Sequence, residues 1–150
     1  MDLVEQSLRN QIAAMTQVLA MSALKDLNIT HILNVTNCLE PSHPNDFVYK
    51  VINVADKEDT NLRQYFEECF EFIDEGKRVG GYVFVHCFVG RSRSVTAVVA
   101  YLMKKYRMTV SQAFEYVRSK CSRASPNVGF IRQFQEFELC KSIYIKICSK

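Results

Sequence analysis

The sequence predicts an α/β domain with a mostly parallel central sheet and helices on both faces. Three short apolar segments, 31–35, 47–54 and 82–85, are rich in branched or aromatic residues, which is typical of buried strands. A polar loop separates the first two and a helical pattern separates the second from the third; across the chain, strands that alternate with helices favour a parallel sheet. The 150 residues contain no internal repeat and no linker, so we expect a single core of ordinary size.

Composition excludes several classes of protein. Hydrophobic residues make up 48% of the chain and charged residues 23%, which is typical of a soluble globular protein. The net charge of +3 is mild and no basic cluster is present, so nothing predicts nucleic-acid binding. No apolar run approaches the roughly 18 residues of a membrane span, and the N-terminus has no secretory signal. Six cysteines without a CxxC pair fit neither a zinc site nor a disulfide framework, so we expect reduced thiols in the cytoplasm or nucleus.

Residues 1–23 form a predicted amphipathic helical segment ahead of the main domain, which we expect at 24–150. Apolar side chains recur in this segment in steps of three or four, at Val4, Leu8, Ile12, Met15 and Leu19. That spacing places them on one face of a helix. The face would either pack on the domain or bind a regulatory partner.

The rest of the chain alternates loops and helices. An acidic loop at 55–60 precedes a helix expected over 61–74, with its apolar side at Leu62, Tyr65, Phe66, Cys69, Phe70 and Ile73. A helix over 95–105 follows the third strand. Thr109 and Gln112 form a predicted capping box for a helix that ends near Lys120. A last helix opens at Pro126 and Asn127, and its expected core residues are Phe130, Ile131, Phe134 and Phe137.

The segment 86–94, with the sequence HCFVGRSRS, follows the third strand and precedes a helix. Backbone N–H groups and the helix dipole at such a position favour a phosphate dianion. The same groups stabilise Cys87 as a thiolate. Arg93 would return to the mouth of the loop and hold two phosphate oxygens. Gly90 allows the tight turn, and the Ser94 hydroxyl can hydrogen-bond the sulfur.

These residues resemble a known family. His86-Cys87, five residues and Arg93-Ser94 are similar to the HCxxxxxR signature of the protein tyrosine phosphatase superfamily. The string AYLM at 100–103, SPN at 125–127 and the following GF resemble its dual-specificity branch, and the match runs from Leu24 to Leu139. DFVYK, DKEDTNL and HCFVGRSRSVT are similar to strings in small plant enzymes that act on MAP kinases. The resemblance implies the dual-specificity phosphatase fold.

The resemblance also implies roles for individual residues. Cys87 would be the nucleophile, Asp56 the general acid, and Arg93 and Ser94 further catalytic groups, with Asp59 as the second candidate for the acid. The predicted substrate-binding residues are Phe88, Val89, Gly90, Arg91, Ser92 and Arg93. His86 would hold the loop. Neither a metal nor a cofactor is implied, because Arg93 and the loop amides supply the positive charge.

The implied activity is hydrolysis of phosphotyrosine and phosphoserine or phosphothreonine through a phosphocysteine intermediate, in a phosphorylated protein such as a MAP kinase. One alternative is a phosphoprotein-binding module with weak or no turnover. Another is a phosphoinositide phosphatase, which Phe88 disfavours and Arg91 favours. RNA triphosphatase relatives carry Thr-Gly after the arginine, whereas this chain has Ser94-Val95.

The chain departs from the family pattern near its N-terminus. Relatives have an edge strand of the type LYLGS, whereas residues 16–23 read TQVLAMSA and predict helix. We therefore expect an atypical N-terminal helix in place of the first edge strand. Its loss would expose the edge of the strand at 31–35.

Overall fold

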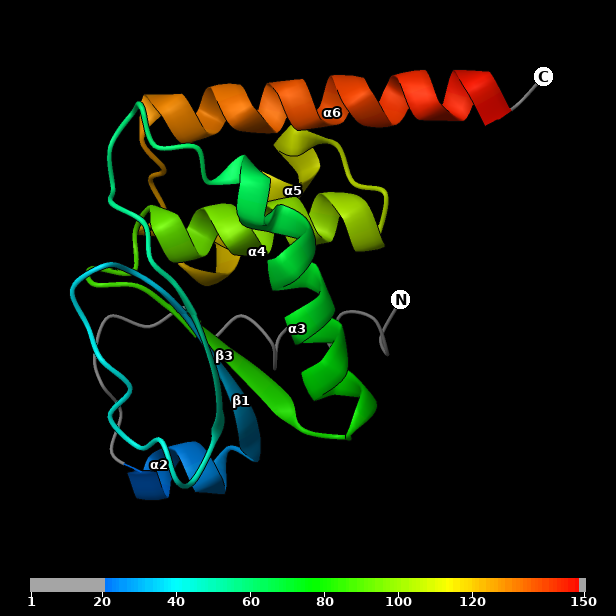
Figure 1. Ribbon diagram of the computed structural model, residues 1–150. Helices are drawn as coiled ribbons and strands as arrows, with labels where there is room; N and C mark the ends of the chain where they lie inside the picture. The colour runs from blue at the N-terminus through cyan, green and yellow to red at the C-terminus, as the bar shows by residue number, and fades with distance from the viewer. Residues whose placement is uncertain (1–20, 149–150) are drawn as a thin grey trace.

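The structure, a computed structural model, describes residues 21–148, with side chains described to residue 140. The predicted helical segment 1–23 lies outside these residues except for its last three, which belong to α2. Figure 1 shows the elements in this order: α2 (Met21–Asp26), β1 (Ile29–Val35), β2 (Val48–Ile52), the 3-10 helix η1 (Arg63–Tyr65), α3 (Phe66–Arg78), β3 (Tyr82–His86), α4 (Arg93–Lys105), α5 (Val110–Lys120) and α6 (Val128–Cys148). None of the helices in this described part is long and apolar enough to cross a membrane.

The described strands form one parallel sheet in the order β2–β1–β3. Ile32 of β1 lies opposite Tyr49 of β2 and Phe84 of β3. The predicted parallel sheet is confirmed. The expectation that β1 lies beside a missing edge strand is wrong, because β1 pairs on both sides and β3 occupies the end of the described sheet.

Helices cover both faces of the sheet, as predicted. Successive strand residues point to opposite faces. On one face, Leu33 and Val35 of β1 and Val83 and Val85 of β3 join the main core with α3 and α4. Ile32 and Phe84 point the other way and pack with Leu24 of α2. α2 lies at the far end of the molecule from α6 (Figure 1). The sheet therefore separates a large core from a small one.

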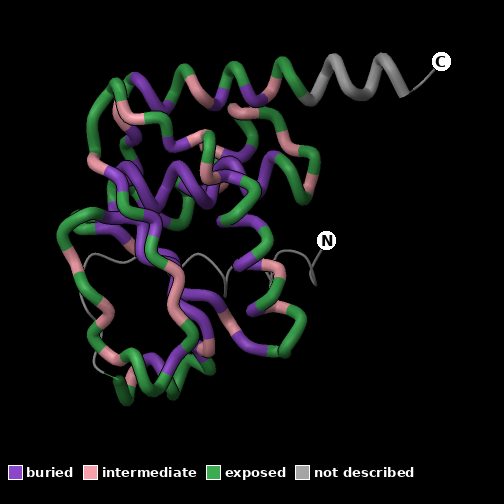
Figure 2. Tube along the Cα trace, viewed as in Figure 1, coloured by how far each residue is buried: buried purple, intermediate pink, exposed green. Residues whose placement is uncertain are grey.

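α4 is the central buried helix of the domain. Every residue from Arg93 to Met103 is buried, and Figure 2 shows this helix enclosed between the sheet and the outer helices. The apolar helix predicted over 95–105 is confirmed, although it begins two residues earlier. Because the helix is fixed on all sides, its N-terminus is a rigid support for the loop that precedes it.

Two details of the predicted helices are wrong. The helix expected over 61–74 instead begins as η1 and continues as α3 to Arg78. Ile131, expected in the core, is 37% exposed, whereas Phe130, Phe134 and Phe137 are buried. Ile131 lies at the border of the stripe that these three rings define, where apolar character alone does not decide burial.

The capping box of α5 yields a test of local stability. Thr109 Oγ1 accepts the Gln112 N–H at 3.2 Å, and Gln112 Oε1 accepts the Thr109 N–H at 3.0 Å. Thr109→Ala removes one of these bonds and should lower the free energy of unfolding by about 1 kcal/mol in urea denaturation. Ser111→Ala, at an exposed position of the same turn, is the control. Equal stability of Thr109→Ala and wild type would contradict this assignment.

Candidate active site

The loop between β3 and α4 lies at the carboxyl end of β3 and leads directly into the buried helix α4. Gly90 has a φ of +72°, in the left-handed region that glycine adopts without strain. Ser92 is the N-cap residue of α4, yet its side chain makes no capping hydrogen bond. The first N–H groups of the helix therefore have no side-chain acceptor, and their partial positive charge favours an anion.

Cys87 places a buried sulfur at this helix terminus. Its Sγ lies 3.1 Å from Ser94 Oγ and accepts the Gly90 N–H at 3.3 Å. The residue is 4% exposed. The sulfur therefore lies within hydrogen-bond distance of two groups of the loop and the first turn of α4.

Arg93 is buried beside the same loop. Its Nη1 donates to Val54 O at 3.0 Å, to Asn37 Oδ1 at 3.2 Å and to Thr36 Oγ1 at 3.3 Å. Its Nε is buried and has no hydrogen-bond partner among the described residues. A buried charged donor without an acceptor is costly, so this edge of the guanidinium suits an anionic oxygen.

The six predicted substrate-binding residues divide into two groups. Gly90, Ser92 and Arg93 are buried. Phe88 is 58% exposed and Val89 is 42% exposed, and Arg91 is also exposed. The three buried residues lie inside the loop. The three exposed residues form its solvent-facing rim.

Asp56 belongs to the acidic loop after β2, and its side chain contacts the loop that carries Cys87 at Ser92. Its Oδ1 accepts hydrogen bonds from Ser92 Oγ and from Asn127 Nδ2, each at 2.8 Å. Asn127 also donates its backbone N–H to Ser92 Oγ at 3.0 Å. The second candidate, Asp59, is exposed and has no hydrogen bond to this loop in the described structure.

Sequence reasoning missed three residues of this site. Thr36 and Asn37 contact Arg93, and Asn127 was predicted only as the start of a helix. The position of Thr36 and Asn37 directly after β1 was an available signal, because ligands bind at the carboxyl ends of parallel strands. Asn127 gave no such signal, since 71 residues separate it from Asp56.

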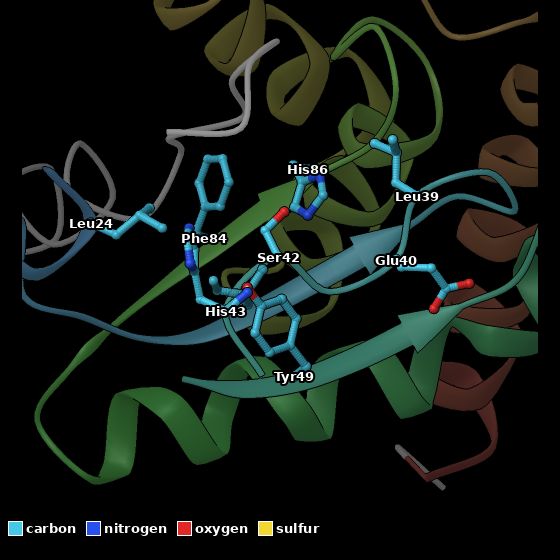
Figure 3. A pocket seen from close by; sticks show the side chains of 9 residues that line it. Leu24, Leu39, Glu40, Ser42, His43, Tyr49, Phe84 and His86 are labelled. Carbon is cyan, nitrogen blue, oxygen red and sulfur yellow. The ribbon is translucent and has the colours of Figure 1, made fainter. Parts of the chain in front are cut away.

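His86 lies on the small-core face of the sheet, and its ring hydrogen-bonds the backbone of Cys87, in agreement with the predicted role of holding the loop. Its ring stacks on Phe84, with ring centroids 5.2 Å apart. Burial lowers the pKa of His86, which keeps its ring neutral at pH 7. The ring lines a small cavity of about 40 Å³ with Leu24, Ile32, Leu39, Glu40, Ser42, His43, Tyr49 and Phe84 (Figure 3). This cavity and α4 contact opposite faces of the sheet, and His86 is the lining residue next to Cys87.

The described residues contain no cluster of three or more His, Cys, Asp or Glu side chains that could hold a metal ion.

Comparison with known proteins agrees with this geometry. Residues 11–140 match the family model described as the catalytic domain of dual specificity phosphatases. The chain belongs to the dual-specificity phosphatase family. The resemblance seen in the sequence is thereby confirmed, and the family match begins ahead of α2.

Two similar relatives come from Arabidopsis thaliana. Dual specificity protein phosphatase 1 is 65% identical over 117 residues, which are 78% of this chain and 59% of that protein. Dual specificity protein phosphatase 1B is 58% identical over 115 residues, which are 77% of this chain and 69% of that protein. MAP kinase phosphatase with leucine-rich repeats protein 1 from Dictyostelium discoideum is 46% identical over 78% of this chain and 14% of that protein. The phosphatase domain thus spans only part of the length of these relatives.

A solved structure confirms the fold of the phosphatase domain. The human tyrosine phosphatase-like serine/threonine/tyrosine-interacting protein superimposes with a TM-score of 0.77 and 35% identity. The match covers 83% of this chain and 84% of that chain.

The arrangement predicts how the cysteines react with iodoacetate, an anionic alkylating agent. Cys87 should be alkylated, and inorganic phosphate should slow this reaction, because both anions compete for the same cradle. Burial raises the pKa of Cys69 to about 12, so it should stay unmodified at neutral pH. Cys140, which is exposed, is the internal control, because phosphate should not change the rate at which it is alkylated. Peptide mass spectrometry measures the rate of alkylation at each cysteine. Protection of Cys140 equal to that of Cys87 would contradict a specific anion site.

Proposed function

We propose that this chain hydrolyses phosphotyrosine and phosphoserine or phosphothreonine in phosphoproteins, with a phosphocysteine intermediate at Cys87. The observation that carries the proposal is the convergence of three groups on one helix N-terminus. These are the buried sulfur of Cys87, the unpaired Nε of Arg93 and the carboxyl group of Asp56. Family membership supports the same activity.

Binding places the phosphate dianion over the sulfur. The backbone N–H groups of the loop donate to its oxygens, and the helix dipole favours its charge. Arg93 adds the Nε edge of its guanidinium, while Nη1 stays bonded to Val54 O and Asn37. Because those bonds already fix the guanidinium, little reorganisation accompanies binding.

In the first chemical step, the thiolate of Cys87 attacks phosphorus. The S–P bond forms as the bond from phosphorus to the leaving oxygen breaks. The Asp56 carboxyl group gives its proton to that oxygen. The seryl, threonyl or tyrosyl side chain then leaves as a neutral hydroxyl group.

In the second step, the Asp56 carboxylate takes a proton from a water molecule whose oxygen attacks phosphorus. The P–S bond breaks, and inorganic phosphate and the thiolate are released. The Ser94 hydroxyl, 3.1 Å from the sulfur, stabilises the departing negative charge. The cycle needs no metal ion because Arg93 and the loop amides carry the charge of the transferred group.

The rim of the loop supports a broad choice of substrate. Phe88 and Val89 are exposed rather than set in a deep wall, so both a phenyl phosphate and the shorter phosphate of threonine can reach the sulfur. The name of the Dictyostelium discoideum relative supports MAP kinases as the substrate class.

A second candidate is phosphoprotein binding without turnover. It is favoured by one observation, the human structural relative named as a phosphatase-like interacting protein. Both candidates use the same anion cradle, and they differ in whether phosphate is released.

The test is an assay of a doubly phosphorylated MAP kinase activation-loop peptide in the presence of a metal chelator. Wild type should release phosphate. Cys87→Ser should abolish release yet keep peptide binding, and Arg93→Ala should lose both, because the arginine holds the phosphate itself. Cys140→Ser, at an exposed position on α6, is the matched control and should keep full turnover.

Release of phosphate by Cys87→Ser at the wild-type rate would contradict the proposal. Binding without release by wild type would favour the second candidate. Hydrolysis of a phosphoinositide with no hydrolysis of the peptide would favour a lipid substrate.

A further inference from the structure

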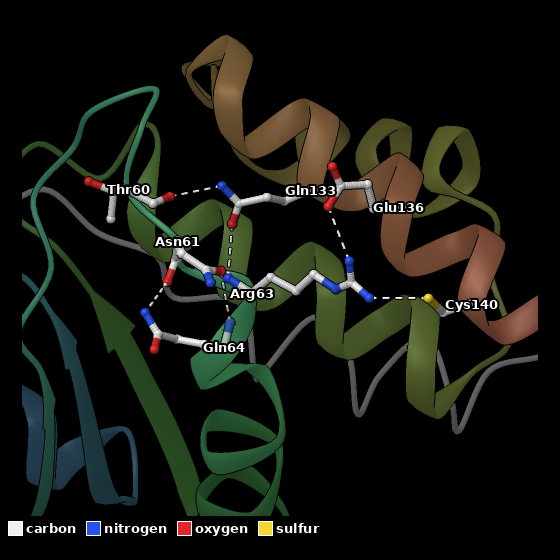
Figure 4. A network of polar contacts seen from close by, with 7 residues as sticks. All are labelled: Thr60, Asn61, Arg63, Gln64, Gln133, Glu136 and Cys140. Atoms are coloured by element: carbon white, nitrogen blue, oxygen red, sulfur yellow. Dashed lines mark hydrogen bonds and ion pairs between the residues drawn. The ribbon is translucent and has the colours of Figure 1, made fainter.

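The segment that carries Asp56 lies along one stripe of α6. The positions Gly129, Gln133, Glu136 and Cys140 are three or four residues apart, so they share one face of the helix. Three of them contact the side chain or backbone of Arg63, and Gln133 also contacts Thr60 (Figure 4). This face of α6 therefore contacts the chain between the acidic loop and α3, at Glu58, Thr60 and Arg63.

Gln133 makes two hydrogen bonds to backbone atoms of this path. Its Nε2 donates to Thr60 O at 2.8 Å, and its Oε1 accepts the Arg63 N–H at 2.9 Å. One half-buried amide thus spans the turn at which the acidic loop becomes η1. The ion pair of Arg63 with Glu136 lies beside it, but both side chains are partly exposed, so that pair contributes little.

Gly129 brings the same helix against the loop backbone. A Cβ at this position would lie 1.9 Å from Glu58 O, which is far inside van der Waals contact. The backbone at Glu58 therefore rests directly on the first turn of α6. Only a residue without a side chain allows this approach.

The contacts of Gln133 and Gly129 differ from the hydrogen bonds that Ser92 and Asn127 make to Asp56. Those two bonds end on the carboxyl group itself, so they change whenever that group gains or loses its proton. The bonds of Gln133 end on the backbone and do not depend on protonation. Asp56 is exposed and lies between β2 and η1, outside any helix or strand, so its position relative to the Cys87 loop depends on backbone contacts of this second kind, which include the bond of Arg93 Nη1 to Val54 O.

We propose that Gln133 is a positioning residue that holds the acidic loop against α6, so that the Asp56 carboxyl group reaches the leaving oxygen of the substrate. The inference rests on the proposed function, because it assigns Asp56 the role of acid. Gly129 sets the distance between loop and helix, and Gln133 fixes the loop at that distance.

The role has a signature that a purely structural role lacks. Proton donation matters most when the leaving group is a strong base. Phenyl phosphate leaves as a phenol with a pKa of about 10, like tyrosine, whereas 4-nitrophenyl phosphate leaves as a much weaker base. A misplaced acid should therefore slow the first substrate far more than the second.

The experiment compares kcat/KM for these two substrates in Gln133→Met and wild type, because kcat/KM reports the first chemical step and does not include hydrolysis of the phosphocysteine, which is common to both substrates. Gln133→Met should lower kcat/KM for phenyl phosphate by about tenfold or more, with less than about a twofold change for 4-nitrophenyl phosphate. Gln135→Met is the matched control, because Gln135 lies exposed on the same helix, and it should match wild type. In an Asp56→Asn background, Gln133→Met should have no further effect on the ratio of the two rates.

The outcomes separate the inference from the proposed function. No hydrolysis of either substrate by wild type would overturn both. The positioning role alone would be overturned if wild type is active and Gln133→Met loses activity equally toward both substrates. It would also be overturned if Gln133→Met still changes the ratio of the two rates in the Asp56→Asn background. If Gln133→Met does not fold, Gln133→Glu carries the test. It keeps the acceptor for Arg63 N–H and loses the donor to Thr60 O, so the same dependence on the leaving group is expected.

Discussion

The buried guanidinium of Arg93 is the interaction on which the rest of the site depends. It sits at the start of α4, after β3, and its Nη1 bonds the segment after β1 at Asn37 and the segment after β2 at Val54. One charged group thus joins the carboxyl ends of all three described strands. No carboxylate of the described residues forms an ion pair with it, and its Nε has no acceptor among them. A buried cation without a countercharge is costly, and a phosphate dianion would supply both the countercharge and the acceptor for Nε.

Asp56, the proposed acid, is attached to this centre by a separate set of contacts. Ser92 belongs to the Cys87 loop and Asn127 precedes α6, and both bond the Asp56 carboxyl group. Asn127 Oδ1 in turn accepts the Phe130 N–H at 2.9 Å, so the same side chain caps the start of α6 and bonds the Asp56 carboxyl group. α6 therefore acts as the support of the acidic loop, as α4 does for the Cys87 loop. The two supports pack together in the core through residues such as Phe134.

Much of this arrangement could be predicted from the sequence. The three strands have local signatures, as do the capping box of α5 and the turn at Gly90, because each depends on residues close together in the chain. The order of the strands could not be predicted. Hydrophobic periodicity indicates where a strand is but not which strands pair, and for that reason the central position of β1 was missed.

The contacts of the site that were missed share a physical cause. Thr36 and Asn37 bond an arginine more than fifty residues away, and Gln133 bonds the backbone at Thr60. A polar side chain that serves a distant backbone group looks the same in a sequence as one that faces solvent. Gln133 and Gln135 are an example, since only the fold distinguishes them.

The central claim is that the sulfur of Cys87 takes the phosphoryl group. The most direct measurement mixes the wild-type chain with phosphopeptide, quenches the reaction in acid during turnover, and locates phosphorus by peptide mass spectrometry. The account predicts phosphate on Cys87 and on no other residue. Turnover that leaves Cys87 unmodified, or phosphate found on a different side chain, would contradict it.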